Sequence, residues 1–299
     1  MHHLLRSLFV LLVAFLVLVL NGCDAYEQDK YQKQYVVQGY LVALEPLTPI
    51  SLSTTVPLNE RYGLTDTAVK NAQVEVQLLN DKGQPEKTFL YQADPDSASL
   101  YKPIDIVTPV LPSRTYALRV TFPDKPDVIT AKTQVPDTMK VMRTNGSTFK
   151  YQQQPQFEQL ISQSKNPNRQ AYFIFSVESL TPSPENLVPF WDPDNGFGGD
   201  RKPPKIYASP ILNEANYRTP EGNLLVQLPW LTVVYFGRNK VTTTVLDDAT
   251  YEFFRTQSVQ LGGSTLSPGE IPNAVSNIQG GTGVFGSFAR ASSFMTVIR

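Results

Sequence analysis

Apolar and polar residues alternate along several short stretches of the chain, which is the pattern of β-strands with one buried face. The alternation runs through residues 50–56, 73–79, 116–122 and 129–135, and Tyr35–Val42 is apolar on both faces, as expected of a central strand. Segments rich in Gly, Pro, Asn and Asp separate these stretches. The pattern therefore predicts a mainly β fold.

The spacing of these strands predicts a first domain over residues 31–137, an immunoglobulin-like β-sandwich. Pro123 and Pro126 fit its turns and Pro136 its exit, because proline cannot donate to a central ladder. We expect a second β-rich domain over residues 138–299, since the pattern becomes more irregular there. The length also allows one large β domain.

In the second half, strands are expected at Ala171–Val177, Leu231–Gly237 and Lys240–Leu246, followed by closing strands at Val284–Phe288 and Phe294–Ile298. A long loop rich in Pro, Gly and Asn is predicted over residues 181–223, and loops of this length are usually functional or disordered. Trp230, Tyr235 and Phe236 flank or lie within a strand and are expected in the core.

A single helix is predicted near residues 247–260. Asp247 or Asp248 would be its N-cap, because a short acidic side chain accepts hydrogen bonds from the first free backbone amides. Phe253 and Phe254 would face the core, and Gly262 would follow the end of the helix.

The N-terminal segment predicts a lipoprotein signal peptide over residues 1–22. Arg6 precedes an uncharged apolar run, Leu8–Leu20, of about 13 residues, too short for a membrane span. Small Gly22 then stands before Cys23, the one cysteine of the chain. We expect Cys23 to be lipidated and residues 23–30 to form a flexible polar tether. An ordinary secretory signal is the alternative.

Cleavage before Cys23 changes the chemistry of the mature chain. His2 and His3, the only histidines, would be removed, and lipidation would modify the only thiol. Nucleophile–base pairs built on His or Cys, and zinc sites of the Cys/His kind, are therefore excluded. The net charge of −1, with no Lys/Arg stripe, argues against nucleic acid as a partner. We expect no catalytic residues, no cofactor and no metal.

The predicted 181–223 loop holds the candidate binding residues, which are aromatic and acidic side chains. They are Phe190, Trp191, Asp192, Asp194, Phe197, Asp200 and Tyr207. The aromatic side chains could hold a sugar ring or a partner surface, or they could anchor the loop to the sheet. The carboxylates could collect calcium, although Pro193 and a missing terminal Glu depart from the EF-hand spacing, so a solvated turn is the other interpretation.

Several motifs together resemble one known family. They are Tyr35–Leu41 soon after the predicted lipidated cysteine, Val69–Val76, Arg114–Val120 and the terminal Ser276–Gly286. This set is similar to the domain-of-unknown-function family 4249 of Bacteroidota outer-membrane lipoproteins. Within Ser276–Gly286, Gly280, Gly281 and Gly283 are expected to form a tight turn into the last strands.

The resemblance implies an outer-membrane lipoprotein, facing the cell surface or the periplasm, often encoded beside a TonB-dependent receptor and with no established activity. Three short motifs also resemble the O-glycosylation signal of exported Bacteroidota proteins, and their acceptors would be Thr67, Ser97 and Thr138. No catalytic residue is implied, because the family supplies none.

The leading functional hypothesis is thus a lipid-anchored, non-enzymatic accessory or binding protein of the outer membrane, which partners a TonB-dependent receptor in nutrient uptake. Two alternatives remain open. One is a cell-surface glycan hydrolase that uses a pair of carboxylates, since this chemistry needs no histidine. The other is a structural component of the envelope or of adhesion.

Overall fold

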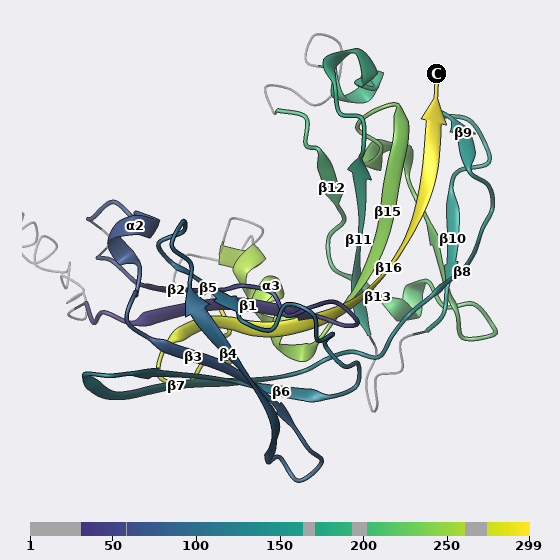
Figure 1. Ribbon diagram of the computed structural model, residues 1–299. Coiled ribbons are helices and arrows are strands. Elements are labelled where there is room, and N and C mark those ends of the chain that lie inside the picture. The colour runs from purple at the N-terminus through teal and green to yellow at the C-terminus, as the bar shows by residue number, and fades with distance from the viewer. Residues whose placement is uncertain (1–30, 58, 164–170, 193–201, 261–273) are drawn as a thin grey trace, which may run out of the picture. The chain divides into compact units, whose positions relative to one another are not determined.

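Strands are the predominant secondary structure of the computed structural model, which confirms the predicted mainly β class (Figure 1). The structure describes residues 31–57, 59–163, 171–192, 202–260 and 274–299. Gln34–Arg299 form one compact unit. The predicted signal peptide and tether, with Cys23, lie outside the described residues.

The strands of the first half are β1 (Tyr35–Val42), β2 (Ile50–Thr54), β3 (Gln73–Leu79), β4 (Pro85–Ala93), β5 (Leu100–Pro103), β6 (Thr115–Phe122) and β7 (Lys125–Gln134). Those of the second half are β8 (Val141–Thr144), β9 (Thr148–Lys150), β10 (Glu158–Ile161), β11 (Tyr172–Ser179), β12 (Ile206–Ala208), β13 (Leu212–Asn213), β14 (Leu224–Gln227), β15 (Gly237–Leu246) and β16 (Thr282–Ile298). The α-helices are α2 (Leu64–Thr67) and α3 (Asp248–Ser258). No described helix is long and apolar enough to cross a membrane.

One large sheet runs through the molecule, with the strand order β12-β11-β15-β16-β1-β2-β5-β4-β3-β6-β7. Three strands of the second half form a separate small sheet, with the strand order β14-β10-β8. Strand β1 pairs in parallel with β16, so a strand near the start of the chain lies against the last one (Figure 1). The large sheet bends back on itself, because Thr133 of β7 hydrogen-bonds Ser287 of β16.

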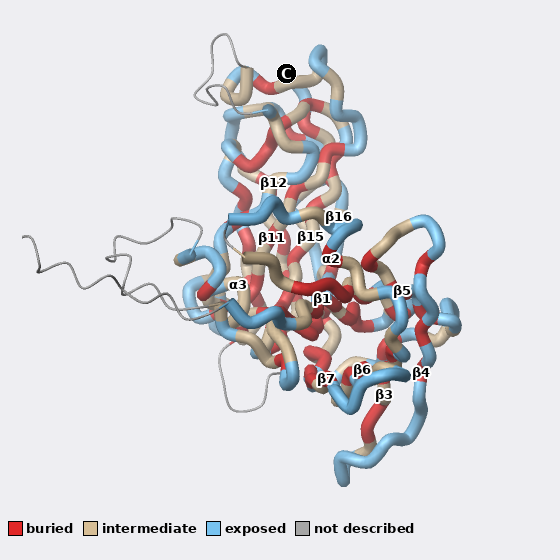
Figure 2. Tube along the Cα trace, turned by 90° about the vertical axis from the view of Figure 1, so that its left-hand side faces the viewer, coloured by how far each residue is buried: buried red, intermediate tan, exposed pale blue. Residues whose placement is uncertain are grey.

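Two hydrophobic cores follow from the alternation of side chains along these strands. Buried positions along β1, β3 and β6, among them Val37, Val76 and Leu118, form the first core (Figure 2). The second core begins at Met139, close to the predicted domain boundary at residue 137. However, Phe285 of β16 is fully buried in the first core, so the last strand completes the domain that was predicted to end at residue 137.

The predicted strand at Leu231–Gly237 is wrong. Trp230–Thr232 form a 3₁₀ turn capped by Pro229, and regular pairing begins only at Gly237, the first residue of β15. The β-branched residues suggested a strand, but proline supplies no backbone donor and favours the start of a turn. Phe236 is buried as expected, whereas Trp230 and Tyr235 are half-buried.

The two predicted closing strands are a single strand, β16, which pairs with β15 from Phe288 to Val297 without a break. The small residues between the two predicted segments do not interrupt this ladder. The predicted 181–223 loop is also more structured than expected, because it contains β12, β13 and three 3₁₀ turns, Pro184–Asn186, Pro189–Trp191 and Glu214–Asn216.

Helix α3 begins as predicted, since the Asp247 side chain accepts a hydrogen bond from the Thr250 amide as N-cap. The predicted buried face is wrong. Phe253 and Phe254 are only half-buried, whereas Thr250 and Thr256 are buried. The helix packs so closely on β16 that a Cβ on Gly286 would lie 2.1 Å from the Thr250 hydroxyl, which leaves no room for a larger side chain at the contact. Gly262 lies outside the described residues.

The terminal glycines form the expected turn into the last strand. Gly280 and Gly283 have φ angles of +78° and +109°, which other residues rarely adopt. A Cβ on Gly283 would lie 2.0 Å from the Val37 carbonyl oxygen of the neighbouring β1. These glycines therefore allow β16 to approach β1 closely enough for parallel pairing.

Candidate functional site

The structure brings together the described aromatic residues of the predicted binding loop. The Trp191 ring lies 5.7 Å from Phe190 and 6.2 Å from Tyr207, both in near-perpendicular arrangements. The Trp191 indole N–H donates to the Leu231 carbonyl at 3.1 Å. Because Phe190 and Trp191 pack against the second core, they anchor the loop to the sheet and leave only part of each ring available to a ligand.

The acidic part of the predicted loop is only partly described. Asp192 is half-buried, whereas Asp194, Phe197 and Asp200 lie outside the described residues, so the calcium interpretation stays untested. Within the described ranges, no three His, Cys, Asp or Glu side chains are grouped in a way that would hold a metal ion.

The predicted O-glycosylation acceptors differ in accessibility. Thr67 is buried, and its hydroxyl donates to the Gly63 carbonyl at 2.8 Å. Modification at Thr67 would therefore have to precede folding or open helix α2. Ser97 and Thr138 are half-buried outside the strands, and their glycosylation stays a prediction.

Five strongly exposed apolar side chains of the first domain lie on or beside the loop that follows β5. We call this set the apolar patch, and it consists of Leu44, Leu90, Ile104, Ile106 and Val107, with exposed fractions of 61, 56, 58, 68 and 79%. The Ile104 amide bonds the Leu90 carbonyl, and the Leu44 amide bonds the Val110 carbonyl. These bonds tie the loop to the strands on both sides.

Asp105 holds this loop in a fixed turn. Its Oδ1 accepts hydrogen bonds from the amides of Val107 at 3.1 Å and Thr108 at 2.8 Å, and its Oδ2 accepts from the Thr108 hydroxyl at 2.6 Å. Lys87 lies 3.3 Å from the same carboxylate. The Thr108 hydroxyl and the backbone amides hold the pKa of Asp105 well below its usual range. Ile106 and Val107 are thus presented to solvent by a charged, hydrogen-bonded turn.

The apolar patch was not predicted from the sequence. The signal was the segment Pro103–Pro109, in which apolar residues flank an aspartate between two prolines without strand or helix periodicity. Apolar side chains in such a turn have no partner on their own element. Exposed apolar side chains that lie close together on a surface are candidates for an interaction site.

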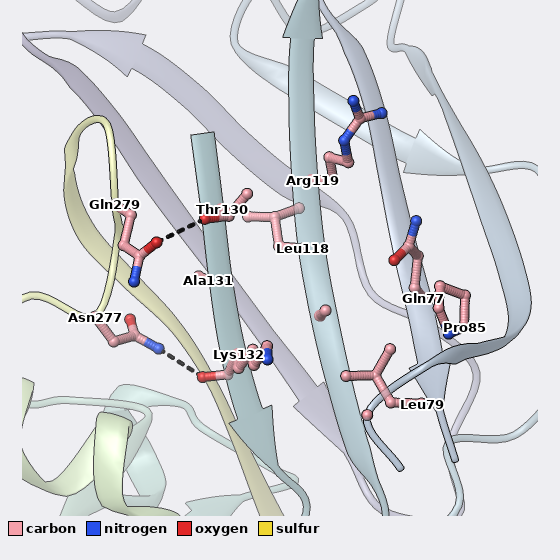
Figure 3. Close-up of a pocket in the computed structure, with 12 residues that line it drawn as sticks. Gln77, Leu79, Pro85, Leu118, Arg119, Thr130, Ala131, Lys132, Asn277 and Gln279 are labelled. Carbon is pink, nitrogen blue, oxygen red and sulfur yellow. Dashed lines mark hydrogen bonds between the residues drawn. The ribbon is translucent and has the colours of Figure 1, made fainter. Parts of the chain in front are cut away.

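An open groove of about 530 Å³ lies over β3, β6 and β7, close to the segment that precedes β16 (Figure 3). The backbone of Gln279 pairs with that of Thr130, and the side-chain amide of Asn277 donates to the Lys132 carbonyl at 2.9 Å. The polar side chains that line the groove are Gln77, Arg119, Thr130, Lys132, Asn277 and Gln279. This set offers hydrogen-bond donors and two cations to a polar ligand.

Asp247, Thr133 and Ser287 form a buried polar cluster that combines hydroxyls with a carboxylate. The Thr133 hydroxyl donates to Asp247 Oδ2 at 2.7 Å and lies 2.5 Å from the Ser287 hydroxyl. Burial raises the pKa of Asp247, although Thr250 and Ser287 also donate amides to it. All three residues are at most 4% exposed, so the cluster joins α3 to β7 and β16 and does not face a substrate.

A family model described as "Domain of unknown function (DUF4249)" matches residues 24–293, which confirms the resemblance seen in the sequence. No curated protein sequence matches the chain.

Several solved structures are distantly similar. An alpha-2-macroglobulin from Salmonella, reacted with methylamine, shares 11% identity over 89% of this chain and 15% of its own, with a TM-score of 0.24. A trypsin-activated alpha-2-macroglobulin from Escherichia coli shares 12% identity over 73% of this chain and 14% of its own, with a TM-score of 0.21. Three N-terminal domains of the bacteriophage RB49 outer capsid protein Hoc share 9% identity over 89% of this chain and 71% of their own, with a TM-score of 0.19. The chain thus spans only a small part of the macroglobulins, and TM-scores this low establish no common fold.

Proposed function

Since the chain belongs to the family described as Domain of unknown function (DUF4249), whose description names no activity, we propose a role from its sequence and surface. It is a lipid-anchored accessory protein of the outer membrane that binds a partner protein through the apolar patch. The partner is a TonB-dependent receptor engaged in nutrient uptake. The proposed location at the outer membrane is based on the predicted signal peptide and Cys23. The proposed receptor partner is based on the family resemblance.

The apolar patch is the observation that carries this proposal. Apolar side chains that face water are unfavourable relative to buried ones, by about 25 cal/mol per Å² of apolar surface. The turn built on Asp105 prevents Ile106 and Val107 from folding back onto the first core. A partner that covers these side chains would recover that free energy, as in the apolar centre of protein interfaces.

The patch fits a protein partner better than a sugar or a small metabolite. Its side chains are aliphatic and offer no hydrogen bonds for the orientation of a polar ligand. Lys87 and Lys102 lie on the strands next to it, paired with Asp105 and Asp94 at 3.3 and 2.8 Å. This arrangement of an apolar centre with charged residues at its margin is typical of interface anatomy.

Co-purification from membranes of the native host tests the proposal. We expect a TonB-dependent receptor to accompany the full-length protein in mild detergent, and labelled palmitate to be incorporated at Cys23. The double substitution Ile106→Ser with Val107→Ser should reduce recovery of the receptor at least tenfold without a change in lipidation. Both positions are exposed, so the fold should be retained.

Ile206→Ser is the matched control, because Ile206 is an exposed aliphatic residue on β12, packed in neither core. It should leave recovery of the receptor unchanged. Recovery of the protein alone from wild-type membranes, or equal recovery of the receptor with the patch variant, would contradict the proposal.

A further inference from the structure

A separate opening lies on the face of β1, β2, β5 and β16 that is turned away from the first core, and we call it the Tyr40 pocket. Its volume is about 440 Å³, within the range of small-molecule sites. Its side chains include a row across three strands, because Gln38 pairs with Ser51 and Ser51 pairs with Leu100. The floor of the pocket is therefore built on regular strands, and Glu45, Thr48 and Pro49 of the β1–β2 connection complete its lining.

One wall of the Tyr40 pocket is aromatic. The rings of Tyr40 and Phe288 lie 6.0 Å apart, tilted by 39°, and Phe254 of α3 packs against Tyr40 at 5.9 Å. Pro49 and Leu100 extend this apolar wall. Aromatic faces carry a partial negative charge, so they attract the slightly positive C–H groups of a saturated ring.

The lining also holds an ion pair between Glu45 and Arg290, which lies beside the aromatic wall because Arg290 follows Phe288 by two residues along β16. The Arg290 Nε and Nη2 atoms donate to the two Glu45 carboxylate oxygens, each at 2.5 Å. Both side chains are more than a third exposed, so each keeps free hydrogen-bonding capacity toward the pocket. The pair acts as a combined donor and acceptor surface with no net charge.

The ion pair between Glu45 and Arg290 favours a ligand without a charge. A carboxylate or an ammonium group would have to compete with a bidentate contact that already neutralises both side chains. A neutral hydroxylated ligand can instead add hydrogen bonds to the pair without breaking it. Among neutral ligands, a pyranose combines a C–H face for Tyr40 and Phe288 with a rim of hydroxyls for Glu45, Arg290 and Gln38.

We propose that the Tyr40 pocket binds a neutral sugar ring. This inference is independent of the apolar patch, because it uses different residues and a different chemistry, and neither test depends on the other. The site is a binding site and not a catalytic one, since Glu45 is the one carboxylate among its lining residues and glycoside hydrolysis needs two.

Saturation-transfer NMR and calorimetry with the purified protein test this proposal. The probes are the methyl glycosides of glucose, galactose and mannose, with glucuronate and glucosamine as charged counterparts. We expect at least one neutral glycoside to bind with a Kd below 10 mM and more tightly than its charged counterparts. Phe288→Leu and Arg290→Gln should each weaken that binding at least tenfold.

Phe294→Leu is the matched control, because Phe294 lies on the same strand and is 47% exposed but does not line the pocket. It should leave the Kd unchanged. Arg290 is exposed, so Arg290→Gln keeps the test valid even if Phe288→Leu fails to fold. Absence of binding by all three neutral glycosides, tighter binding of a charged sugar, or an unchanged Kd in folded Arg290→Gln would overturn the proposal.

Discussion

Single glycines determine how closely the first and last strands of this protein approach each other. The contact of Gly283 with the Val37 carbonyl leaves no space for even one methyl group, and its φ angle of +109° is unfavourable for other residues. The clash acts between β16 and β1, whereas the φ strain would lie within the backbone of residue 283 itself. The regular geometry of an ordinary β ladder would not require glycine at this position.

Gly283→Ala should therefore destabilise the protein by about 3 kcal/mol, because strained backbone of this kind costs 1–3 kcal/mol before any displacement of β1 is added. Urea unfolding at neutral pH measures the change. Gly83→Ala is the control, since Gly83 also has a positive φ but no atom lies within 4 Å of an added Cβ. Its loss should be about 1 kcal/mol, and equal losses for the two variants would show that the clash has no effect.

Asp247 gives the protein a specific pH dependence. Burial raises its folded-state pKa above the ordinary value near 3.8, so the folded state binds the proton more tightly than the unfolded state does. The stabilisation from this proton is complete below the unfolded pKa and is lost as pH rises through the folded pKa. Asp247→Asn should remove this decline, because an amide can still accept from Thr250 and Ser287 and donate to Thr133.

Chemical unfolding of the wild type and Asp247→Asn between pH 3 and 8 checks this expectation, and parallel curves would refute it. Asp105→Asn is the comparison, because Asp105 should affect the pH dependence of stability in the opposite direction. The pKa of Asp105 is lowered, so its stabilisation is present above the unfolded pKa and is lost as pH falls. That variant should lose stability at neutral pH and little in acid.

At the scale of elements, alternation of apolar and polar residues was sufficient to predict β2, β3, β6 and β7, and a run apolar on both faces predicted β1. Helix α3 was also found from its cap, but its buried face was not, since a glycine on β16 lets threonines make the contact in place of the phenylalanines. Prediction failed at Leu231–Gly237, where β-branched residues follow a proline and the backbone forms only an isolated bridge, between Tyr235 and Leu187, in place of a ladder. The sequence pattern indicates which residues favour a strand conformation. It does not indicate whether a neighbouring strand is available for backbone pairing.

The candidate sites were less predictable than the strands. Phe190, Trp191 and Tyr207 do meet, as expected of loop aromatics, although they mainly anchor the loop. The apolar patch and the Tyr40 pocket depend on residues that are brought together from distant segments. Glu45 and Arg290 are separated by 245 residues, so no local motif could have revealed their pairing.

Strand β16 contributes differently to the fold at its two ends. Phe285 is fully buried in the first core, whereas Phe294 is 47% exposed beside Arg238. Phe285→Ala should cost about 3–5 kcal/mol, the usual loss for a large core side chain. Phe294→Ala on the same strand should cost about 1 kcal/mol or less. Denaturant midpoints with unchanged slopes would establish both values, and similar losses would contradict this division of the strand.

At the scale of the whole molecule, the two cores share β16 and are joined by the Asp247 cluster, so we expect them to unfold together. Trp191 and Trp230, the only two tryptophans, both pack against the second core and report on it by fluorescence. Phe285→Ala lies in the first core. It should nevertheless shift the fluorescence transition and the circular dichroism transition by the same amount, and an unmoved fluorescence midpoint would show that the cores unfold independently.

The parallel pairing of β1 with β16 also sets an order of events during synthesis. The ribosome releases β1 early, but its partner emerges only after every other strand, so the first core cannot close on a nascent chain. Contacts between such distant segments form slowly, because a very long loop must be closed first. The pairing that completes the first core is consequently formed only after β16 has been synthesised.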